Sequence, residues 1–327
     1  GVYANCTSGS NLAALGQGSH TIQVRHTDLA SNTGISPTNT FTIDSIAPVV
    51  AVSSPANGGL YNTSTPALSF SVTDVHPGAT SFCSIDGGAY VACTSGSNLS
   101  ALGDGTHTIQ VRNTDTYGNA GYSVSHSFTL DTGAPTIAVS GPSGLTNNDS
   151  PNVTGSTDQP NGSSVSVTIT GPTGDTCSAT VSGGAWSCAV GPLADGAYSI
   201  SATTTDTAGN SATATGSFDL DNTEPVVAIS GPSLTNDSTP TVNGTTDQPN
   251  GSTVTLKNSN GDTLCSATVA SGAWSCTVTG FPLTEGPNTL TAETTDPAGN
   301  TGTGSSVTTL DTGAPTIAVS GPSGLTN

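Results

Sequence analysis

The stretch TLDTGAPTIAVSGPSGLTN (residues 129–147) decides the fold class, because it occurs a second time, unchanged, at residues 309–327. Related versions are TIDSIAPVVAVS, which begins at residue 42, and DLDNTEPVVAISGPS, which begins at residue 219. The repeats of solenoids and propeller blades are shorter, at about 20–50 residues. Here the copies lie 87, 90 and 90 residues apart, measured between Asp44, Asp131, Asp221 and Asp311. This period predicts tandem domains, each with its own core.

Within each repeat, short apolar runs alternate with Thr and Ser, as in TIQVR (21–25), SVSVTIT (164–170) and YSISAT (198–203). Alternation with a period of two predicts strands that bury one face. Helices are disfavoured, because the chain has one Lys, three Glu, two Arg and no Met to cover helix surfaces. We therefore predict an all-β fold of tandem immunoglobulin-like β-sandwich domains. The linkers end in Pro, which restricts the preceding residue to extended conformations, so we expect an extended rod.

The domain boundaries that we predict follow the repeat. Residues 1–48 are expected to be the C-terminal half of an Ig-like domain, and residues 316–327 the first strand of a further one. The complete Ig-like domains are expected at 49–135, 136–225 and 226–315. The chain starts with Gly rather than Met and shows no signal peptide, so we expect it to be part of a longer protein. In the last complete domain, strands are expected at 226–231, 239–245, 252–257, 263–269, 273–278, 288–293 and 305–310.

The charge excludes two functional classes. Twenty-two acidic residues face three basic ones, which gives a net charge of −19. Nucleic-acid binding requires Lys and Arg to neutralise phosphates, so no nucleic-acid partner is expected. No stretch approaches 18 consecutive apolar residues, so no membrane insertion is expected in this segment. Low hydrophobicity (32%) with charge of one sign is also typical of disorder, but the regular strand pattern favours folded domains.

A second pattern accompanies the repeat. TDTAGN (205–210) and TDPAGN (295–300), with a looser TDTYGN (114–119), precede the strand–Asp-Thr-x-Ala-Pro–strand pattern by about 15 residues. With these residues the whole chain resembles the bacterial Ig-like repeats of large surface adhesins and other extracellular bacterial proteins. FCSIDGG (82–88) is similar to a variant of that family with a shorter middle hairpin. The resemblance implies the Ig-like fold and calcium-stiffened junctions, in domains that mostly serve as spacers.

The cysteines predict the compartment. Six of the seven form pairs 10, 11 and 11 residues apart, one pair in each complete domain, and each pair flanks a Gly-rich turn. Facing positions of a hairpin come within disulfide range. Zinc is disfavoured, because there is no Cys-x-x-Cys and no nearby His. Cys6 matches Cys93, so its partner is expected before residue 1. Disulfides indicate an oxidising compartment, here the extracellular space or the bacterial cell surface. The predicted bonds are Cys83–Cys93, Cys177–Cys188 and Cys265–Cys276.

Aspartates supply the candidate site chemistry, since 19 of the 22 acids are Asp. Asp is favoured in turns and as an oxygen ligand for Ca²⁺. If the seven expected strands are lettered A to G in chain order, antiparallel pairing places the B–C loop, the F–G loop and the incoming linker at one end of each domain, which gathers three carboxylates. We therefore predict Ca²⁺ at each junction, with turn-forming Asp and no ion as the alternative. The expected ligands are Asp44, Asp74, Asp115 and Asn119; Asp131, Asp158, Asp206 and Asn210; and Asp221, Asp247, Asp296 and Asn300.

Other conspicuous residues are assigned structural roles. Five aspartates of the opposite end are expected in turns: Asp104, Asp175, Asp195, Asp237 and Asp262. His20 and His107 are equivalent in the repeat, which is typical of packing or turn residues rather than of a single catalytic base. Trp186 and Trp274 are equivalent too and are expected in the core. There is no Gly-x-Ser-x-Gly, no phosphate-binding Gly-rich loop and no His-Glu-x-x-His, so no enzyme is predicted.

The leading functional prediction is a structural stalk or fibre segment of a secreted or cell-surface bacterial protein, supporting adhesion or biofilm. Its partners would be the neighbouring repeats of the same chain and an unidentified host-surface or matrix glycan or protein. One alternative is the body of a self-assembling extracellular filament, in which copies share strands or domains. Another is an array of carbohydrate-binding modules, which exposed aromatic residues on one face would support. The chain has 14 aromatic residues in all.

Overall fold

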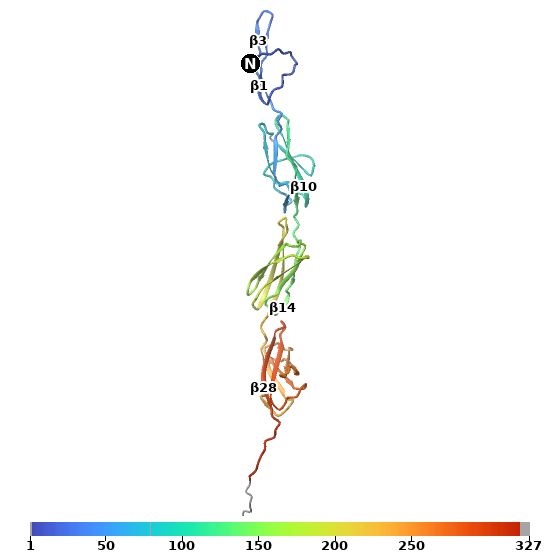
Figure 1. The fold of residues 1–327 in the computed structure, drawn as a ribbon, viewed down its shortest axis with the longest axis vertical. Coiled ribbons are helices and arrows are strands. Elements are labelled where there is room, and N and C mark those ends of the chain that lie inside the picture. Colours follow the sequence, from blue (N-terminus) through green and yellow to red (C-terminus); the bar gives the residue numbers. More distant parts are fainter. Residues whose placement is uncertain (1, 79, 321–327) are drawn as a thin grey trace, which may run out of the picture. The chain divides into compact units, whose positions relative to one another are not determined.

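The computed structural model describes residues 2–78 and 80–320, which form strands and loops (Figure 1). This part of the chain has 28 strands and no helix, so the all-β prediction is confirmed. It accordingly holds no helix with the length and apolar character needed to cross a bilayer. The chain forms two compact units, Gly1–Ala134 with Thr207–Asn210, and Pro135–Asp206 with Ser211–Asn327.

The first strands of the chain are paired two by two. β1 pairs with β4 and β2 with β3, all antiparallel. These strands are exposed or half-buried. Their bounds are β1 (Gly18–Ile22), β2 (Arg25–Thr27), β3 (Thr33–Ile35) and β4 (Asn39–Ile43).

The next eight strands form the β5–β12 sandwich. One sheet is the β5–β7 pair, and the other has the order β6-β12-β10-β8-β9 with β11 added beside β10. The sheets enclose a cluster of buried residues that includes Val52, Leu68, Val111 and Phe128. The bounds are β5 (Val49–Ser54), β6 (Gly59–Tyr61), β7 (Ser69–Thr73), β8 (Ser81–Ile85), β9 (Val91–Cys93), β10 (Gly105–Thr114), β11 (Ala120–Tyr122) and β12 (His126–Leu130).

The β13–β20 sandwich packs a three-stranded sheet, β13-β15-β18, against a five-stranded one, β14-β20-β19-β16-β17. In β16 every second residue is buried, which is the period-two pattern that the sequence predicts. The bounds are β13 (Ile137–Gly141), β14 (Gly144–Thr146), β15 (Asn152–Thr157), β16 (Ser164–Thr170), β17 (Asp175–Thr180), β18 (Ala185–Ala189), β19 (Gly196–Thr205) and β20 (Ser211–Leu220).

The β21–β28 sandwich repeats this topology, with sheets β21-β23-β26 and β22-β28-β27-β24-β25. It has its own buried cluster around Val242, Leu256 and Leu290. The bounds are β21 (Val227–Gly231), β22 (Leu234–Thr235), β23 (Thr241–Thr246), β24 (Thr253–Lys257), β25 (Thr263–Thr268), β26 (Ala273–Thr277), β27 (Gly286–Thr295) and β28 (Thr301–Leu310).

In these two sandwiches a glycine leaves the space that a buried tryptophan ring fills. Gly155 of β15 lies opposite Trp186 of β18, and a Cβ added to Gly155 would stand 2.2 Å from the Trp186 ring. Gly244 and Trp274 repeat the arrangement in β23 and β26. Both indoles are buried, at 3% and 2% exposure, as expected for core residues.

The structure joins all three predicted cysteine pairs, with Cα–Cα distances of 5.8, 6.1 and 5.9 Å. The hairpin expected around each pair is present for Cys83 and Cys93, on the paired strands β8 and β9. It is wrong for the other two pairs. Cys177 and Cys188 lie on edge strands of opposite sheets, β17 and β18, so that disulfide fastens the sandwich together, and the Cys265–Cys276 bond does the same. Cys6 is exposed and unpaired.

Two strand predictions need correction. Strands F and G of the β21–β28 sandwich are ten residues each, longer than expected, because Thr-rich ends continue the ladder beyond the buried segment. Residues 316–320 form no strand, and Ile317 and Val319 are exposed. The equivalent strands β5, β13 and β21 pair with β7, β15 and β23, and no described strand follows residue 316 to provide such a partner. Residues 321–327 of that expected strand lie outside the described residues.

Candidate functional site at the linkers

The Thr-Asp-x-x-Gly-Asn loop is closed by its own aspartate. The Asp296 Oδ1 accepts hydrogen bonds from the backbone N–H groups of Gly299 (2.8 Å) and Asn300 (2.9 Å), and its Oδ2 accepts one from the Asn300 side chain (2.9 Å). Asp115 does the same for Tyr117 and Asn119 in the β5–β12 sandwich. A short polar side chain that bonds the backbone ahead of it is a turn-former. These aspartates are therefore occupied by local bonds.

The asparagine that ends each loop holds the linker. Its Nδ2 donates to the backbone carbonyl of the linker aspartate, over 3.1 Å from Asn119 to Asp44, 2.7 Å from Asn210 to Asp131 and 2.7 Å from Asn300 to Asp221. These partners are 75 to 79 residues apart in sequence. The three bonds join the same two positions of the repeat. They fix the linker to the Thr-Asp-x-x-Gly-Asn loop of the sandwich that follows it.

A second bond holds the linker from the side that precedes it. The residue after each linker aspartate donates its backbone N–H to a side-chain oxygen. The acceptor residue stands directly before strand β1, β10, β19 or β27. Asn222 bonds Asp195 over 2.8 Å, and Thr132 bonds Asp104 over 3.0 Å. Ser45 bonds Gln17 over 2.9 Å, and Thr312 bonds Glu285 over 3.2 Å. Asp104 and Asp195 were expected in turns of their own domain, and this contact with the linker was missed.

The aspartates of the B–C loops bind the backbone just before the first strand of their own sandwich. Both carboxylate oxygens of Asp247 lie 3.0–3.1 Å from the N–H of Val226, and those of Asp158 lie equally close to the N–H of Thr136. The hydrogen bond from Thr136 lowers the pKa of Asp158 below its usual value. The linker, the B–C loop and the F–G loop thus lie together, as the sequence predicts. They are joined by hydrogen bonds between side chains of the loops and backbone groups of the linker. Asp206 also interacts with a neighbouring group.

Hydrogen bonding also sets the protonation of the loop aspartates. Burial raises the pKa of Asp296, but the hydrogen bonds from the side chain and backbone of Asn300 and from Gly299 outweigh it, so the pKa lies below its usual value. The same balance lowers the pKa of Asp115. Both carboxylates are therefore ionised at neutral pH, as an acceptor of several N–H groups must be.

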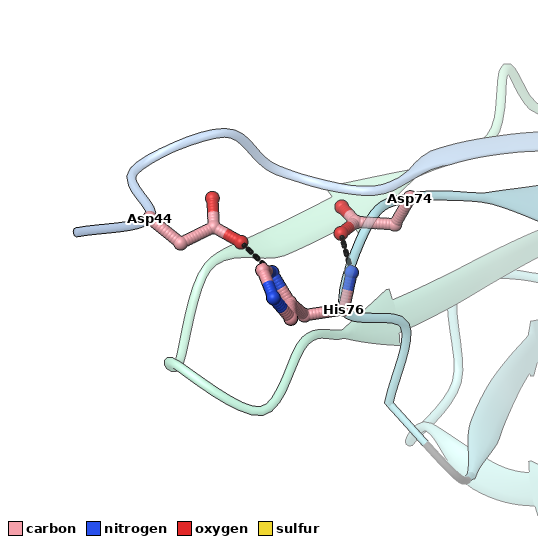
Figure 2. A group of neighbouring side chains, drawn as sticks. All are labelled: Asp44, Asp74 and His76. Atoms are coloured by element: carbon pink, nitrogen blue, oxygen red, sulfur yellow. Dashed lines mark hydrogen bonds and ion pairs between the residues drawn. The ribbon is translucent and has the colours of Figure 1, made fainter. Parts of the chain in front are cut away.

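One group of side chains stands apart from this pattern. Asp44, Asp74 and His76 place donor atoms within 4.8 Å of one another, and in the described part of the chain no other three His, Cys, Asp or Glu side chains do so. Figure 2 shows Asp44 directed at the His76 ring, with 2.8 Å between Oδ2 and Nδ1, and Asp74 directed at the His76 backbone N–H, at 2.7 Å. The Asp44 side chain is only 7% exposed. The Asp74 Oδ2 is buried and has no hydrogen-bond partner.

The group borders a cavity of about 440 Å³, with Gln17, Ile46 and Val49 also in its lining. His76 is half-exposed, and its ring packs edge-on against Tyr117 at 5.1 Å. The sequence analysis missed His76, because it is not part of the repeat. The available signal was its place two residues after Asp74, within the loop that was expected to supply a ligand.

The predicted ligand sets thus differ between junctions. Asp44 and Asp74 lie together, whereas Asp115 and Asn119 of that set bond one another and the linker. In the third set Asp221 accepts from the N–H of Thr223, and Asp247 and Asp296 are bonded as described. Carboxylates with one short bond and a free, buried oxygen suit a cation. Carboxylates with every oxygen bonded suit a turn.

Solved structures of adhesion proteins are similar to this chain. Comparison with curated protein sequences found no match. A structure of a tetra-tandem repeat in the extending region of a large adhesion protein is 28% identical, covers 91% of this chain and 82% of its own, and has a TM-score of 0.36. A Ca²⁺-stabilised adhesin that helps an Antarctic bacterium reach out and bind ice is 26% identical, with coverage of 90% and 82% and a TM-score of 0.39.

The match to a family model is more specific. The model of the bacterial Ig-like domain matches residues 138–222 and again residues 228–312, which together are more than half of the chain. Each match contains the two sheets, the disulfide and the Gly–Trp pair of one sandwich. The chain therefore belongs to the family of bacterial Ig-like domains.

Proposed function

We propose that this chain is a non-enzymatic stalk segment of a secreted or cell-surface bacterial adhesin, whose domains hold a binding region away from the cell and support adhesion or biofilm. The observation that carries the proposal is the linker held from both sides. In the stretch 221–226, Asn300 bonds the carbonyl of Asp221, Asp195 bonds the N–H of Asn222, and Asp247 bonds the N–H of Val226. Such bonds restrict the backbone of the linker. A spacer of fixed length requires that restriction, whereas a flexible tether does not.

The test is whether these bonds restrict the motion between neighbouring sandwiches. Double electron–electron resonance between spin labels on the β13–β20 and β21–β28 sandwiches gives the distribution of distances between the two labels. We expect a narrow distribution for the chain as it is. Replacing Asn222-Thr223-Glu224 by Gly-Gly-Gly removes the Thr223 hydroxyl bond to Asp195 and loosens the backbone, so the distribution should broaden. Equally broad distributions in both proteins would refute a stiff spacer.

We further propose that Ca²⁺ binds at Asp44 and Asp74. The support is the chemistry of the donors: two carboxylates beside a linker, one nearly buried and one with a buried oxygen lacking a partner. A buried carboxylate oxygen without a donor is costly, and a cation relieves that cost. Calcium takes six to eight oxygen ligands, so backbone carbonyls or waters would complete the shell. The sets around Asp131 and Asp221 remain predictions from the sequence.

Calorimetric titration with Ca²⁺ after EDTA treatment tests this site. We expect binding, and a higher melting temperature of unit Gly1–Ala134, in the unchanged protein. Asp74→Asn keeps the shape but loses the charge, and should abolish both effects. Asp237→Asn is the matched control, because Asp237 only closes a turn with Thr239. Binding that survives in Asp74→Asn would assign the ion to another junction, and no binding at all would leave turn formation as the role of these aspartates.

A further inference from the structure

The two arginines of the chain occupy equivalent positions and share a pair of neighbours, a tyrosine and a glutamine. Arg25 and Arg112 are 87 residues apart, and each guanidinium lies over a tyrosine ring, at 4.4 Å over Tyr3 and 4.8 Å over Tyr90. The tyrosines are also 87 residues apart. In each copy the tyrosine hydroxyl donates to a glutamine, over 3.0 Å to Gln23 and 2.6 Å to Gln110. We call these two sets the Arg–Tyr patches.

The same glutamines are anchored to the neighbouring strand. The Gln110 Nε2 donates to the carbonyl of Ser123 over 3.0 Å, and the Gln23 Nε2 donates to the carbonyl of Ser36 over 3.1 Å. Each tyrosine is therefore held by a glutamine that is itself fixed to the backbone. Two hydrogen bonds and a stacked arginine keep the ring in one orientation. A surface that is built twice in this way is not a chance meeting of exposed side chains.

The arginines are cations without protein anions. The third basic residue, Lys257, bonds Glu293 over 2.7 Å. Within residues 2–78 and 80–320, neither guanidinium forms an ion pair or donates a hydrogen bond to the protein, although the chain has 22 acidic residues. The Arg112 Nε is buried with no acceptor. A guanidinium offers five donors and pairs best with a carboxylate, so both patches retain a capacity to bind an anion.

Aromatic rings extend the patch around Arg112. Phe82 pairs with Arg112 from β8, with its ring 5.3 Å from the guanidinium, and Tyr122 pairs with Arg112 from β11. The Tyr122 side chain is 52% exposed and contacts Tyr90 edge-on, with 6.0 Å between ring centroids. An exposed aromatic face accepts the apolar C–H face of a sugar ring, while the adjacent guanidinium accepts a carboxylate. The combination selects a sugar that carries a carboxylate.

The other sandwiches lack this chemistry at the same positions. Arg112 pairs with Tyr122 in the register of β10 and β11, and the equivalent pair in the β13–β20 sandwich is Thr203 with Thr213, joined by a hydroxyl bond of 2.9 Å. In the β21–β28 sandwich it is Glu293 with Thr303, and Glu293 is neutralised by Lys257. The fold therefore does not require an arginine or a tyrosine here. Small hydroxyl residues serve the sheet equally well.

From this arrangement we propose that the Arg–Tyr patches bind an acidic polysaccharide, with Arg25 and Arg112 each taking the carboxylate of a uronic-acid unit and the tyrosines stacking on sugar rings. Two arginine–tyrosine sites in series suit a ligand that itself repeats, because the second contact is then intramolecular. The site of Arg112 is the larger one, since Tyr122 lies opposite Arg112 whereas Ile35 lies opposite Arg25. A second copy of the acidic chain offers carboxylates but no sugar face, so it explains the arginines and leaves the exposed Tyr122 without a role. The proposal gives the stalk a ligand of its own and does not depend on calcium.

Affinity electrophoresis in gels that contain polygalacturonate tests the proposal with the full 327-residue chain. EDTA is included so that no cation can bridge the polymer and the protein's aspartates. The buffer has about 0.15 M salt, which screens the repulsion from charges beyond about 8 Å. We expect retardation of the unchanged protein, measured against its mobility in a plain gel, and none in gels that contain neutral dextran.

The decisive variant is Arg25→Thr with Arg112→Thr, which installs the residue found in the β13–β20 sandwich. Its affinity should fall at least about tenfold, the usual effect of losing a charged hydrogen bond. Lys257→Gln is the matched control, since it removes a basic residue elsewhere and should leave the affinity unchanged. Tyr122→Thr keeps both arginines and should weaken binding, and melting curves of each variant establish that it is folded.

Three results would overturn the proposal. The first is the absence of retardation of the unchanged protein, and the second is equal retardation by dextran. The third is undiminished binding by the double arginine variant. Sedimentation of the protein alone completes the set. Self-association that the double variant loses, together with no binding of polygalacturonate, would assign the arginines to a second copy of the chain instead.

Discussion

Asn300 connects two segments with one side chain. Its Nδ2 bonds the Asp296 carboxylate within its own loop and the Asp221 carbonyl in the linker, over 2.9 and 2.7 Å. Asn300 is 7% exposed, so truncation would leave the Asp221 carbonyl short of a donor in a nearly buried place. We expect Asn300→Ala to lower the free energy of unfolding by about 1–3 kcal/mol, measured by urea denaturation.

Asn260→Ala is the control for that measurement, because Asn260 is exposed and only its backbone N–H is bonded, to Asn258. It should change the stability by less than about 0.5 kcal/mol. Equal effects of the two substitutions would show that the bond to the linker contributes nothing beyond the loop itself.

His107 makes the stability of the β5–β12 sandwich depend on pH. The hydrogen bond from its Nδ1 to the Asp86 carboxylate (2.8 Å) raises the pKa of His107 above its usual 6.5, and the bond to the Gly103 carbonyl raises it further. The folded state thus binds the proton more tightly than the unfolded state does. The stabilisation is complete below about pH 6.5 and is lost as the pH rises through the raised pKa.

The melting temperature of that sandwich should therefore be higher at pH 5.5 than at pH 8.5, by an amount worth less than about 1 kcal/mol for so exposed a pair. His107→Gln should remove the difference. His20→Gln should preserve it, because His20 occupies the equivalent position but bonds only the Gly16 carbonyl. A pH dependence that persists in His107→Gln would assign the effect to another group.

At the scale of the strand, the tryptophan opposite Gly155 limits which residues can replace this glycine in β15. A Cβ on Gly155 would lie 2.0 Å from the Ala138 carbonyl oxygen and 2.2 Å from the Trp186 ring. Backbone oxygen cannot move away without breaking the β13–β15 ladder, so Gly155→Ala should cost about 1–3 kcal/mol, as overpacking does. Gly174→Ala is the control in the same sandwich, since the nearest atom to its Cβ would be at an ordinary 3.5 Å. Thermal unfolding of both variants distinguishes them, and similar melting temperatures would contradict the steric account.

Strand positions were predictable because their determinants are local. The expected strand at 263–269 differs from β25 by one residue, and 273–278 from β26 by one, since Thr, Val and Ala alternate there with clear turns on either side. β22 was missed. It has two residues and exists only through its parallel partner β28, which lies some 75 residues further along the chain. A strand of that kind leaves no periodic signal in its own sequence.

The sequence predicts which segments form the site, but it does not predict which groups each carboxylate bonds. Topology alone brings the linker and the loops of Asp247 and Asp296 to one end, and the hydrogen bonds agree with that. What the carboxylates do there depends on the competing backbone N–H groups, and those are fixed by turn geometry that composition does not reveal. Asp296 meets two backbone N–H groups and the side-chain amide of Asn300, whereas Asp74 meets one backbone N–H and keeps an oxygen free. That difference separates a turn from a candidate cation ligand.

For the whole chain, the scarcity of basic residues provides a direct measure of how its parts unfold, because trypsin cuts only after Lys and Arg. Arg25 lies in the exposed three-residue strand β2, whereas Arg112 is inside β10 and Lys257 is in β24, both bonded to strands on two sides. Among the described residues, the buried cluster of the β5–β12 sandwich has nine members and that of the β21–β28 sandwich has fifteen. Less buried apolar surface gives less stability.

We therefore expect trypsin to cut the native protein once, after Arg25, and to leave residues 26–327 intact. On warming, the cut after Arg112 should appear at a lower temperature than the cut after Lys257, as mass spectrometry of the products will show. Lys257→Gln identifies the second product by its loss. Simultaneous cleavage at both sites would mean that the sandwiches unfold as one cooperative unit, and earlier cleavage at Lys257 would mean that the size of the core does not order their stabilities. The predicted order requires that each sandwich is stabilised by its own core, which is the property that lets a chain be lengthened by adding copies.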